Sequence, residues 1–168
     1  IIARMDNLYT AVSYFSFALA KDPYMGVGRN LAYKKELFFR NKGFSSHSQL
    51  PGGDDDLFIN KVATKKNTAI VIDPDAFTLS EPKTRWSTWR SQKARHYTTS
   101  KYYKASHKFL LGLFSLSHVL FYPLLAASVL FFNWWITLSV FGLRLIVQGI
   151  IYYRTMNKLD EKDLFWLY

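Results

Sequence analysis

The distribution of hydrophobic residues divides the chain into two regions of different character. The 35 residues from Phe109 to Leu143 contain no Asp, Glu, Lys or Arg, and apolar residues continue past Arg144 to Tyr153. A helix rises about 1.5 Å per residue, so this apolar segment would reach roughly 68 Å, about twice a hydrocarbon core of roughly 30 Å. Two transmembrane helices therefore fit its length better than one.

The predicted transmembrane hairpin occupies residues 109–154. Its spans are expected at about 109–132 and 134–153, joined by a tight turn at Asn133, and Pro123 should kink the first span because it removes a helical hydrogen bond. Basic residues flank both outer ends whereas the turn is uncharged, so both ends are expected to face the cytoplasm. These flanking residues are Lys101, Lys104, Lys108, Arg154, Lys158 and Lys162.

Residues 1–82 contain both helical and strand-like patterns. The first twenty residues predict an amphipathic helix ending near Ala20, and "DDDLFINKVATKK" predicts another, because its acids come first and its lysines last, as the helix dipole favours. The segment "LAYKKELFF" predicts a short strand running into a helix, and "TAIVIDPDAFTLSE" predicts a buried strand, a turn at Asp73–Pro74 and a second short strand. We therefore expect an α/β domain. The first helix is already in progress at Ile1, so we expect a fragment of a longer protein.

Charge is concentrated in the segment that precedes the apolar region. The formal net charge is +10, and residues 83–108 contain eight basic residues, no acid and several interspersed aromatic side chains. This composition predicts a basic amphipathic helix lying in the membrane interface. Residues 155–168 are expected to form a cytoplasmic tail. We interpret His47 as a loop residue and His107 as a headgroup contact.

Three adjacent acids, Asp54 to Asp56, stand within "GGDDDLFIN" and admit two interpretations. Acidic residues are common at helix starts, where the helix dipole stabilises them. Adjacent carboxylates also repel, and a lower dielectric raises at least one pKa, which suits a general base beside a cation or a phosphate group. The tripeptide alone favours the first interpretation, and the neighbouring motifs favour the second.

The segments on either side of these acids resemble motifs of a known enzyme family. "PYMGVGRNLAYKK" (Pro23 to Lys35) precedes the acids, and "WRSQKARHY" (Trp89 to Tyr97) follows them. In this order they resemble the G-x-N-x-A-x-R/K loop, the E/D-D pair and the Q-x-x-R-W motif of membrane-bound, processive-type family-2 glycosyltransferases. That group includes cellulose and hyaluronan synthases and many bacterial relatives.

The resemblance implies roles for individual residues. The E/D-D pair maps to Asp54 and Asp55, and the second acid would be the general base toward the acceptor hydroxyl. Arg95 would lie near the donor diphosphate, where its fork can hold phosphate oxygens. His96 replaces the usual Trp of the motif and offers a smaller stacking surface. The remaining expected substrate-binding residues are Gly28, Arg29, Asn30, Gln92 and Trp89, the last of which could equally be an interface anchor.

The resemblance also implies a fold, partners and a location. Residues 1–82 would be the later part of a GT-A-like nucleotide-diphospho-sugar transferase domain, and this fragment alone should be inactive. A divalent cation, Mg or Mn, is implied, with its main ligands outside the chain. The expected partners are a nucleotide-diphospho-sugar donor, a lipid-linked or polysaccharide acceptor and membrane lipids, without nucleic acid. The protein would lie in a bacterial inner membrane with its catalytic part in the cytoplasm.

Composition alone supports a different class of function. Basic residues interleaved with aromatics also suit a non-catalytic, membrane-anchored module that binds anionic lipid or nucleic acid. The two classes differ in their need for Asp55. A transferase should lose turnover when Asp55 becomes Asn, whereas a basic binding module should not.

Overall fold

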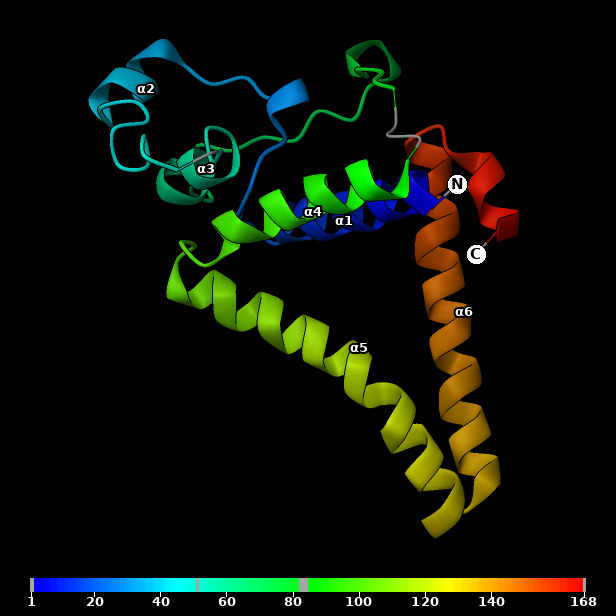
Figure 1. The fold of residues 1–168 in the computed structure, drawn as a ribbon. Helices are drawn as coiled ribbons and strands as arrows, with labels where there is room; N and C mark the ends of the chain where they lie inside the picture. The colour runs from blue at the N-terminus through cyan, green and yellow to red at the C-terminus, as the bar shows by residue number, and fades with distance from the viewer. Residues whose placement is uncertain (1, 51, 82–84, 168) are drawn as a thin grey trace. The chain divides into compact units, whose positions relative to one another are not determined.

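The computed structural model describes residues 2–50, 52–81 and 85–167. The chain divides into two compact units, residues 1–108 and 109–168. Figure 1 shows that the described residues form helices joined by loops. The predicted boundary between residues 82 and 83 lies outside the described residues.

The prediction of an α/β, GT-A-like domain is wrong, because no residue in the described ranges is in a strand. In "LAYKKELFF" the expected strand is a loop, and the helix predicted after it is present as α2 (Lys35–Arg40). The segment "TAIVIDPDAFTLSE" is a loop that contains the short 3₁₀ helix η2 (Pro74–Ala76). A strand needs a partner to satisfy its backbone donors and acceptors, and neither of these segments has one among the described residues. Apolar side chains of the second segment are also poorly covered, with Val71 67% and Leu79 98% exposed. The apolar pattern that predicted strands is therefore present in the sequence, but the described residues form no sheet.

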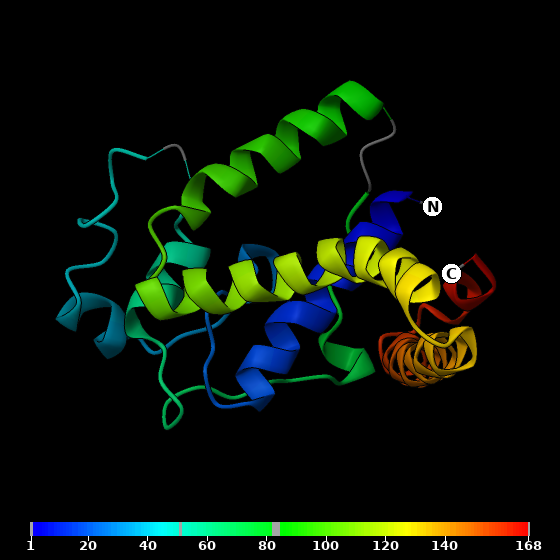
Figure 2. The same ribbon diagram turned by 90° about the horizontal axis from the view of Figure 1, so that it is seen from below.

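The described residues before α5 in the first unit form four α-helices and two short 3₁₀ helices. Helices α1 and α4 run in the same direction in Figures 1 and 2, and an ion pair between Asp6 and Lys93 joins them. Helix α1 ends close to Ala20, as predicted. The bounds are α1 (Ile2–Leu19), η1 (Gly28–Asn30), α2 (Lys35–Arg40), α3 (Asp56–Val62), η2 (Pro74–Ala76) and α4 (Trp86–Ser100).

A small aromatic core surrounds α3. Phe58 is fully buried, and its ring lies 5.6 Å from that of Phe38 and 5.8 Å from that of Phe44, measured between centroids. Gly43 has φ of +53°, and a side chain there would meet the Phe38 ring at 2.7 Å, so the turn after α2 needs glycine. This packing holds α3, and with it the three acids, in a fixed position in the first unit.

The segment expected as one interface helix over residues 83–108 is divided. Helix α4 ends at Ser100, residues 101–104 form a turn, and the next helix starts at Ala105. Residues 83 and 84 lie outside the described residues. The turn brings Tyr103 into the interior of the first unit, where it is 7% exposed.

The second unit is dominated by two long apolar helices. Helix α5 (Ala105–Phe131), whose first residues belong to the first unit, and helix α6 (Trp134–Lys158) are each long and apolar enough to cross a membrane. Asn133 lies between them and caps α6 by accepting a hydrogen bond from the Trp135 backbone N–H. Helix α5 bends along its length in Figure 1, consistent with Pro123 inside it. The chain continues into a 3₁₀ helix, η3 (Lys162–Leu167).

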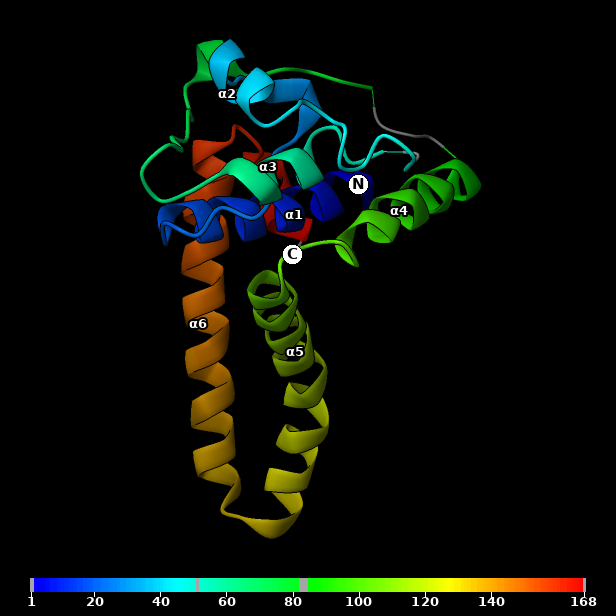
Figure 3. The ribbon, with the colours of Figure 1, turned by 90° about the vertical axis from the view of Figure 1, so that its left-hand side faces the viewer.

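Contacts between α5 and α6 include polar groups as well as apolar ones. Figure 3 shows the turn that joins the two helices. Near it, the hydroxyls of Ser128 and Thr137 are 2.7 Å apart. Farther from the turn, the Arg144 guanidinium lies 3.5 Å from the centroid of the Phe121 ring. A charge within an apolar span costs about 2.5–3.5 kcal/mol on insertion scales, and stacking on an aromatic face offsets part of that cost.

Candidate functional site

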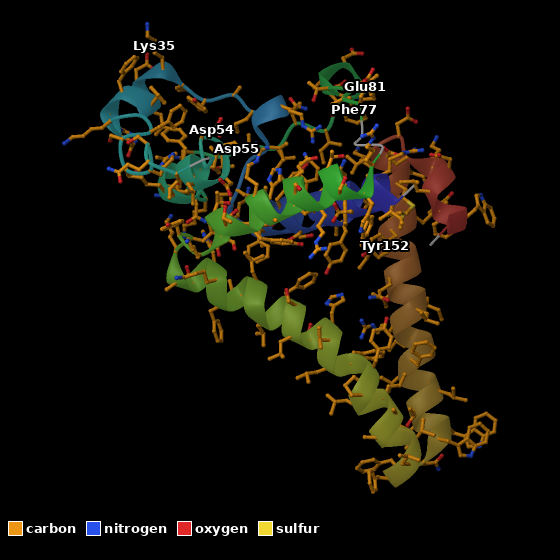
Figure 4. All side chains as sticks on the ribbon, in the orientation of Figure 1. Lys35, Asp54, Asp55, Phe77, Glu81 and Tyr152 are labelled. Atoms are coloured by element: carbon orange, nitrogen blue, oxygen red, sulfur yellow. The ribbon has the colours of Figure 1, made fainter. Side chains whose placement is uncertain are left out.

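The three acids at the start of α3 have different surroundings. Asp54 is exposed, Asp55 is partly buried and Asp56 is 7% exposed. Two glycines precede them, and the φ angles of +133° at Gly52 and +96° at Gly53 are conformations that other residues rarely adopt. Figure 4 shows Asp54 and Asp55 side by side at the start of α3.

Asp55 joins α3 to the glycine loop. It is the N-cap of α3, and its Oδ1 accepts a hydrogen bond of 2.8 Å from the Asp56 backbone N–H. Its Oδ2 accepts another of 2.8 Å from the Gly28 backbone N–H, 27 residues earlier. A Cβ atom at Gly28 would lie 3.1 Å from this oxygen, so the close approach favours glycine. A carboxylate can accept about four hydrogen bonds, so Asp55 retains acceptor capacity toward a ligand.

Arg29 and Asn30 connect the glycine loop to a second loop. The Arg29 guanidinium donates to the Ser80 hydroxyl, and the Asn30 side-chain amide donates to the Ala76 carbonyl at 2.9 Å. The second loop contains the turn predicted at Asp73–Pro74, and the Asp73 carboxylate accepts a hydrogen bond from the Asp75 backbone N–H. Both residues expected to bind substrate thus hold one loop against another.

Asp56 has a structural environment that the sequence analysis missed. Its Oδ2 accepts hydrogen bonds from the Thr99 hydroxyl at 2.5 Å and the Tyr103 hydroxyl at 2.7 Å, and its Oδ1 accepts one from the Leu57 backbone N–H. Burial, together with the Asp56 carboxylate, raises the pKa of the Tyr103 hydroxyl far above its usual range. The carboxylate therefore fixes the end of α4 and the following turn to α3.

Asn60, one helical turn after Asp56, also connects α3 to other segments of the first unit. Its Nδ2 donates to the Tyr24 carbonyl at 2.8 Å and lies 2.9 Å from His107 Nδ1. Its Oδ1 accepts from the Lys104 backbone N–H at 2.9 Å. His107 is 2% exposed, and its Nε2 lies 3.1 Å from Asp22 Oδ1. The interpretation of His107 as a headgroup contact is therefore wrong, because the side chain is enclosed by polar partners within the first unit.

In the sequence, only the spacing of Asp56 and Asn60 indicated that both side chains could make buried polar contacts. Residues four apart lie on one face of a helix, so a helix over this segment places both side chains in the same direction. Polar residues inside an otherwise apolar run, "DLFINKV", are typical of a helix that is buried against polar partners. The partners themselves, Thr99, Tyr103 and His107, are more than forty residues away and have no local signal.

The residues of the expected Q-x-x-R motif lie on α4. Trp89 stacks on Trp86, with ring centroids 4.6 Å apart, and Gln92 is partly buried. Arg95 and His96 are exposed. Among the described residues, the Asp55 carboxylate accepts hydrogen bonds from the Gly28 and Asp56 backbone N–H groups only. The structure therefore joins this carboxylate to the glycine loop and places no Arg95 contact on it.

The divalent cation implied by the resemblance finds no ligand set in the described part of the chain. No group of three or more His, Cys, Asp or Glu side chains is arranged there to hold a metal ion.

Comparisons with protein-family models, with characterised proteins and with solved structures find no match for this chain.

Proposed function

We propose that this chain takes part in inverting sugar transfer, with Asp55 as the general base toward the acceptor hydroxyl. The observation behind the proposal is the hydrogen bond between the Gly28 N–H and Asp55 Oδ2. It joins two of the three segments in which the sequence resembles family-2 glycosyltransferases, although 27 residues separate them. Packing of α3 alone does not require this contact, since the Asp56 and Asn60 side chains already fix the helix.

The proposed reaction is a single displacement. The acceptor hydroxyl oxygen forms a bond to the anomeric carbon of a nucleotide-diphospho-sugar, and its proton passes to the Asp55 carboxylate. The bond between the anomeric carbon and the phosphate oxygen breaks, and the nucleoside diphosphate leaves with the electron pair. The backbone hydrogen bonds to Asp55 keep its carboxylate oriented during this step.

The apolar helices favour an acceptor at a membrane. Helices α5 and α6 can each cross a bilayer, and the lysines before α5 favour the cytoplasmic side. We therefore infer an acceptor that is a lipid-linked sugar or a membrane-associated polysaccharide. The first unit is continuous in sequence with the first apolar helix, so a membrane crossed by α5 would also tether the unit that carries Asp55.

Membranes that contain the protein as its gene encodes it provide the test. They would be supplied with radiolabelled nucleotide sugars, and the labelled lipid or polysaccharide would be counted. Asp55→Asn should lower transfer by about 10²- to 10⁴-fold, the usual contribution of a general base. Asn keeps an oxygen that can cap α3, so the variant should remain folded and membrane-bound.

Asp75→Asn is the matched control, since Asp75 is exposed and lies in the turn after Asp73. It should transfer sugar at the unmodified rate. Equal rates for Asp55→Asn and Asp75→Asn would exclude Asp55 as the base. Membrane binding with no consumption of any nucleotide sugar by the unmodified protein would favour the basic, lipid-binding module instead.

A further inference from the structure

A hollow of about 720 Å³ is lined in part by α3. The other lining residues include the loop that contains Ser45, Ser46, His47 and Ser48, and the lysines are Lys61 from α3 and Lys104 from the turn before α5. We propose that this hollow binds a phosphate group. The inference does not depend on sugar transfer, because neither Asp54 nor Asp55 lines the hollow.

The lining of the hollow matches the chemistry of phosphate. Serine hydroxyls and lysine ammonium groups are donors that phosphate oxygens accept, and the described lining contains no carboxylate that would repel an anion. Lys61 already reaches toward the serine loop, with its Nζ 3.4 Å from Ser46 Oγ. The two lysines come from separate segments of the chain, and both line the hollow.

His47 supplies an independent observation. Its side chain is only 9% exposed, yet its Nε2 has no hydrogen-bond partner among the described residues. Its Nδ1 lies 3.1 Å from Ser46 Oγ. If the Ser46 hydroxyl donates to Nδ1, the ring proton is on Nε2, and this nitrogen is a donor. A buried donor without a partner costs free energy. Because Nε2 is itself buried, a phosphate oxygen in the hollow would satisfy it only after a shift of the serine loop to which His47 belongs.

The position of the hollow indicates two sources for the phosphate group. Tyr102 and Lys104 line it and belong to the turn that leads into α5, the first apolar helix. A phosphate in the headgroup of an anionic lipid would reach it from a membrane surface. A soluble phosphate would reach it from the aqueous side. Recognition uses the same donors in both cases.

Binding can be measured on the whole protein in dodecyl maltoside micelles, which contain no phosphate. In one arm, inorganic phosphate is titrated, and in the other the micelles contain increasing phosphatidylglycerol. The readout is the ¹⁵N chemical shift of the imidazole nitrogens of His47, assigned by comparison with His47→Gln. Saturation by inorganic phosphate would assign a soluble source, and saturation by phosphatidylglycerol alone would assign the lipid headgroup.

Two double variants of equal net charge distinguish binding of phosphate in the hollow from non-specific electrostatic attraction of the anion to the protein. Lys61→Gln with Lys104→Gln should weaken binding by about tenfold or more, because both ammonium groups are removed from the hollow. Lys65→Gln with Lys66→Gln changes the net charge equally, but these exposed lysines follow α3 outside the lining, so binding should change by less than about twofold. Equal weakening by both pairs, or no shift of the His47 nitrogens with either probe, would overturn the proposal.

Discussion

The hydrogen bond from the Tyr103 hydroxyl to Asp56 can be removed by a single oxygen deletion, Tyr103→Phe. The ring is 7% exposed and would keep its packing, including its contact with Tyr24 at 5.9 Å between centroids. Asp56 would keep the Thr99 hydroxyl and the Leu57 backbone N–H as donors. The change therefore isolates one hydrogen bond to a buried carboxylate.

The expected loss follows from the type of bond. A hydrogen bond to a charged group contributes about 1.5–3 kcal/mol, so the free energy of unfolding should fall by that amount. For a chain of this size, 1 kcal/mol corresponds to about 2–4 °C in Tm, so the midpoint should fall by about 3–12 °C. The assay is thermal unfolding of the whole protein in detergent, followed by circular dichroism. Tyr102→Phe is the control, since Tyr102 is 51% exposed, and its Tm should match that of the unmodified protein within about 2 °C.

The pH dependence of unfolding gives a second test of the same contact. The pKa of Tyr103 is raised in the folded protein from its ordinary value of 10.0, mainly because the residue is buried. Above pH 10 the unfolded chain releases this proton and the folded protein keeps it, so stability falls as pH rises. The fall from this one group is about 1.4 kcal/mol per pH unit, and Tyr103→Phe should lack it. Identical alkaline slopes and identical midpoints for the two proteins would refute a buried Tyr103–Asp56 bond.

Two further substitutions test the glycine loop and the turn between the apolar helices. Gly28→Ala would place a Cβ 3.1 Å from Asp55 Oδ2, and because small misplacements of a reacting group are costly, it should lower the rate of sugar transfer by about tenfold or more. Gly112→Ala is the control, since a Cβ there meets nothing within 4 Å and the rate should not change. An unchanged rate for both variants would count against the Gly28–Asp55 contact. Asn133→Ala removes the cap of α6 and should lower the free energy of unfolding by about 1 kcal/mol, or Tm by about 2–4 °C. Asn133→Asp keeps an acceptor for the Trp135 N–H and should therefore lose much less stability. Equal losses in both variants would argue against a capping role.

The parts of the fold that the sequence predicted correctly depend on local patterns. The end of α1, the helix at "DLFINKV", the turn at Asp73 and the two long apolar helices each follow from periodicity, capping residues or composition. The predicted strands failed because a strand depends on a distant partner, and an apolar segment such as "TAIVID" looks the same with or without one. Local propensity cannot distinguish a paired segment from an unpaired one.

In the candidate site, too, contacts between distant segments were harder to predict than local features. The resemblance assigned both Gly28 and Asp55 to the expected substrate site, and a hydrogen bond joins them in the structure. The connections of Asp56 and Asn60 were missed, because their partners at the end of α4 and the start of α5 become neighbours only through tertiary packing. Adjacent acids in the sequence therefore face different surroundings, since successive helical residues point about 100° apart.

Helix α3 is only two turns long, yet its side chains connect it to two other parts of the first unit. Asp55, its N-cap, holds the glycine loop, while Asp56 and Asn60 bind the turn that enters α5. Because Asp55 and Asp56 are neighbours in the chain, a single peptide unit lies between the contact to the glycine loop and the contact to that turn. A substitution that loosens the turn would therefore also disturb the orientation of the Asp55 carboxylate.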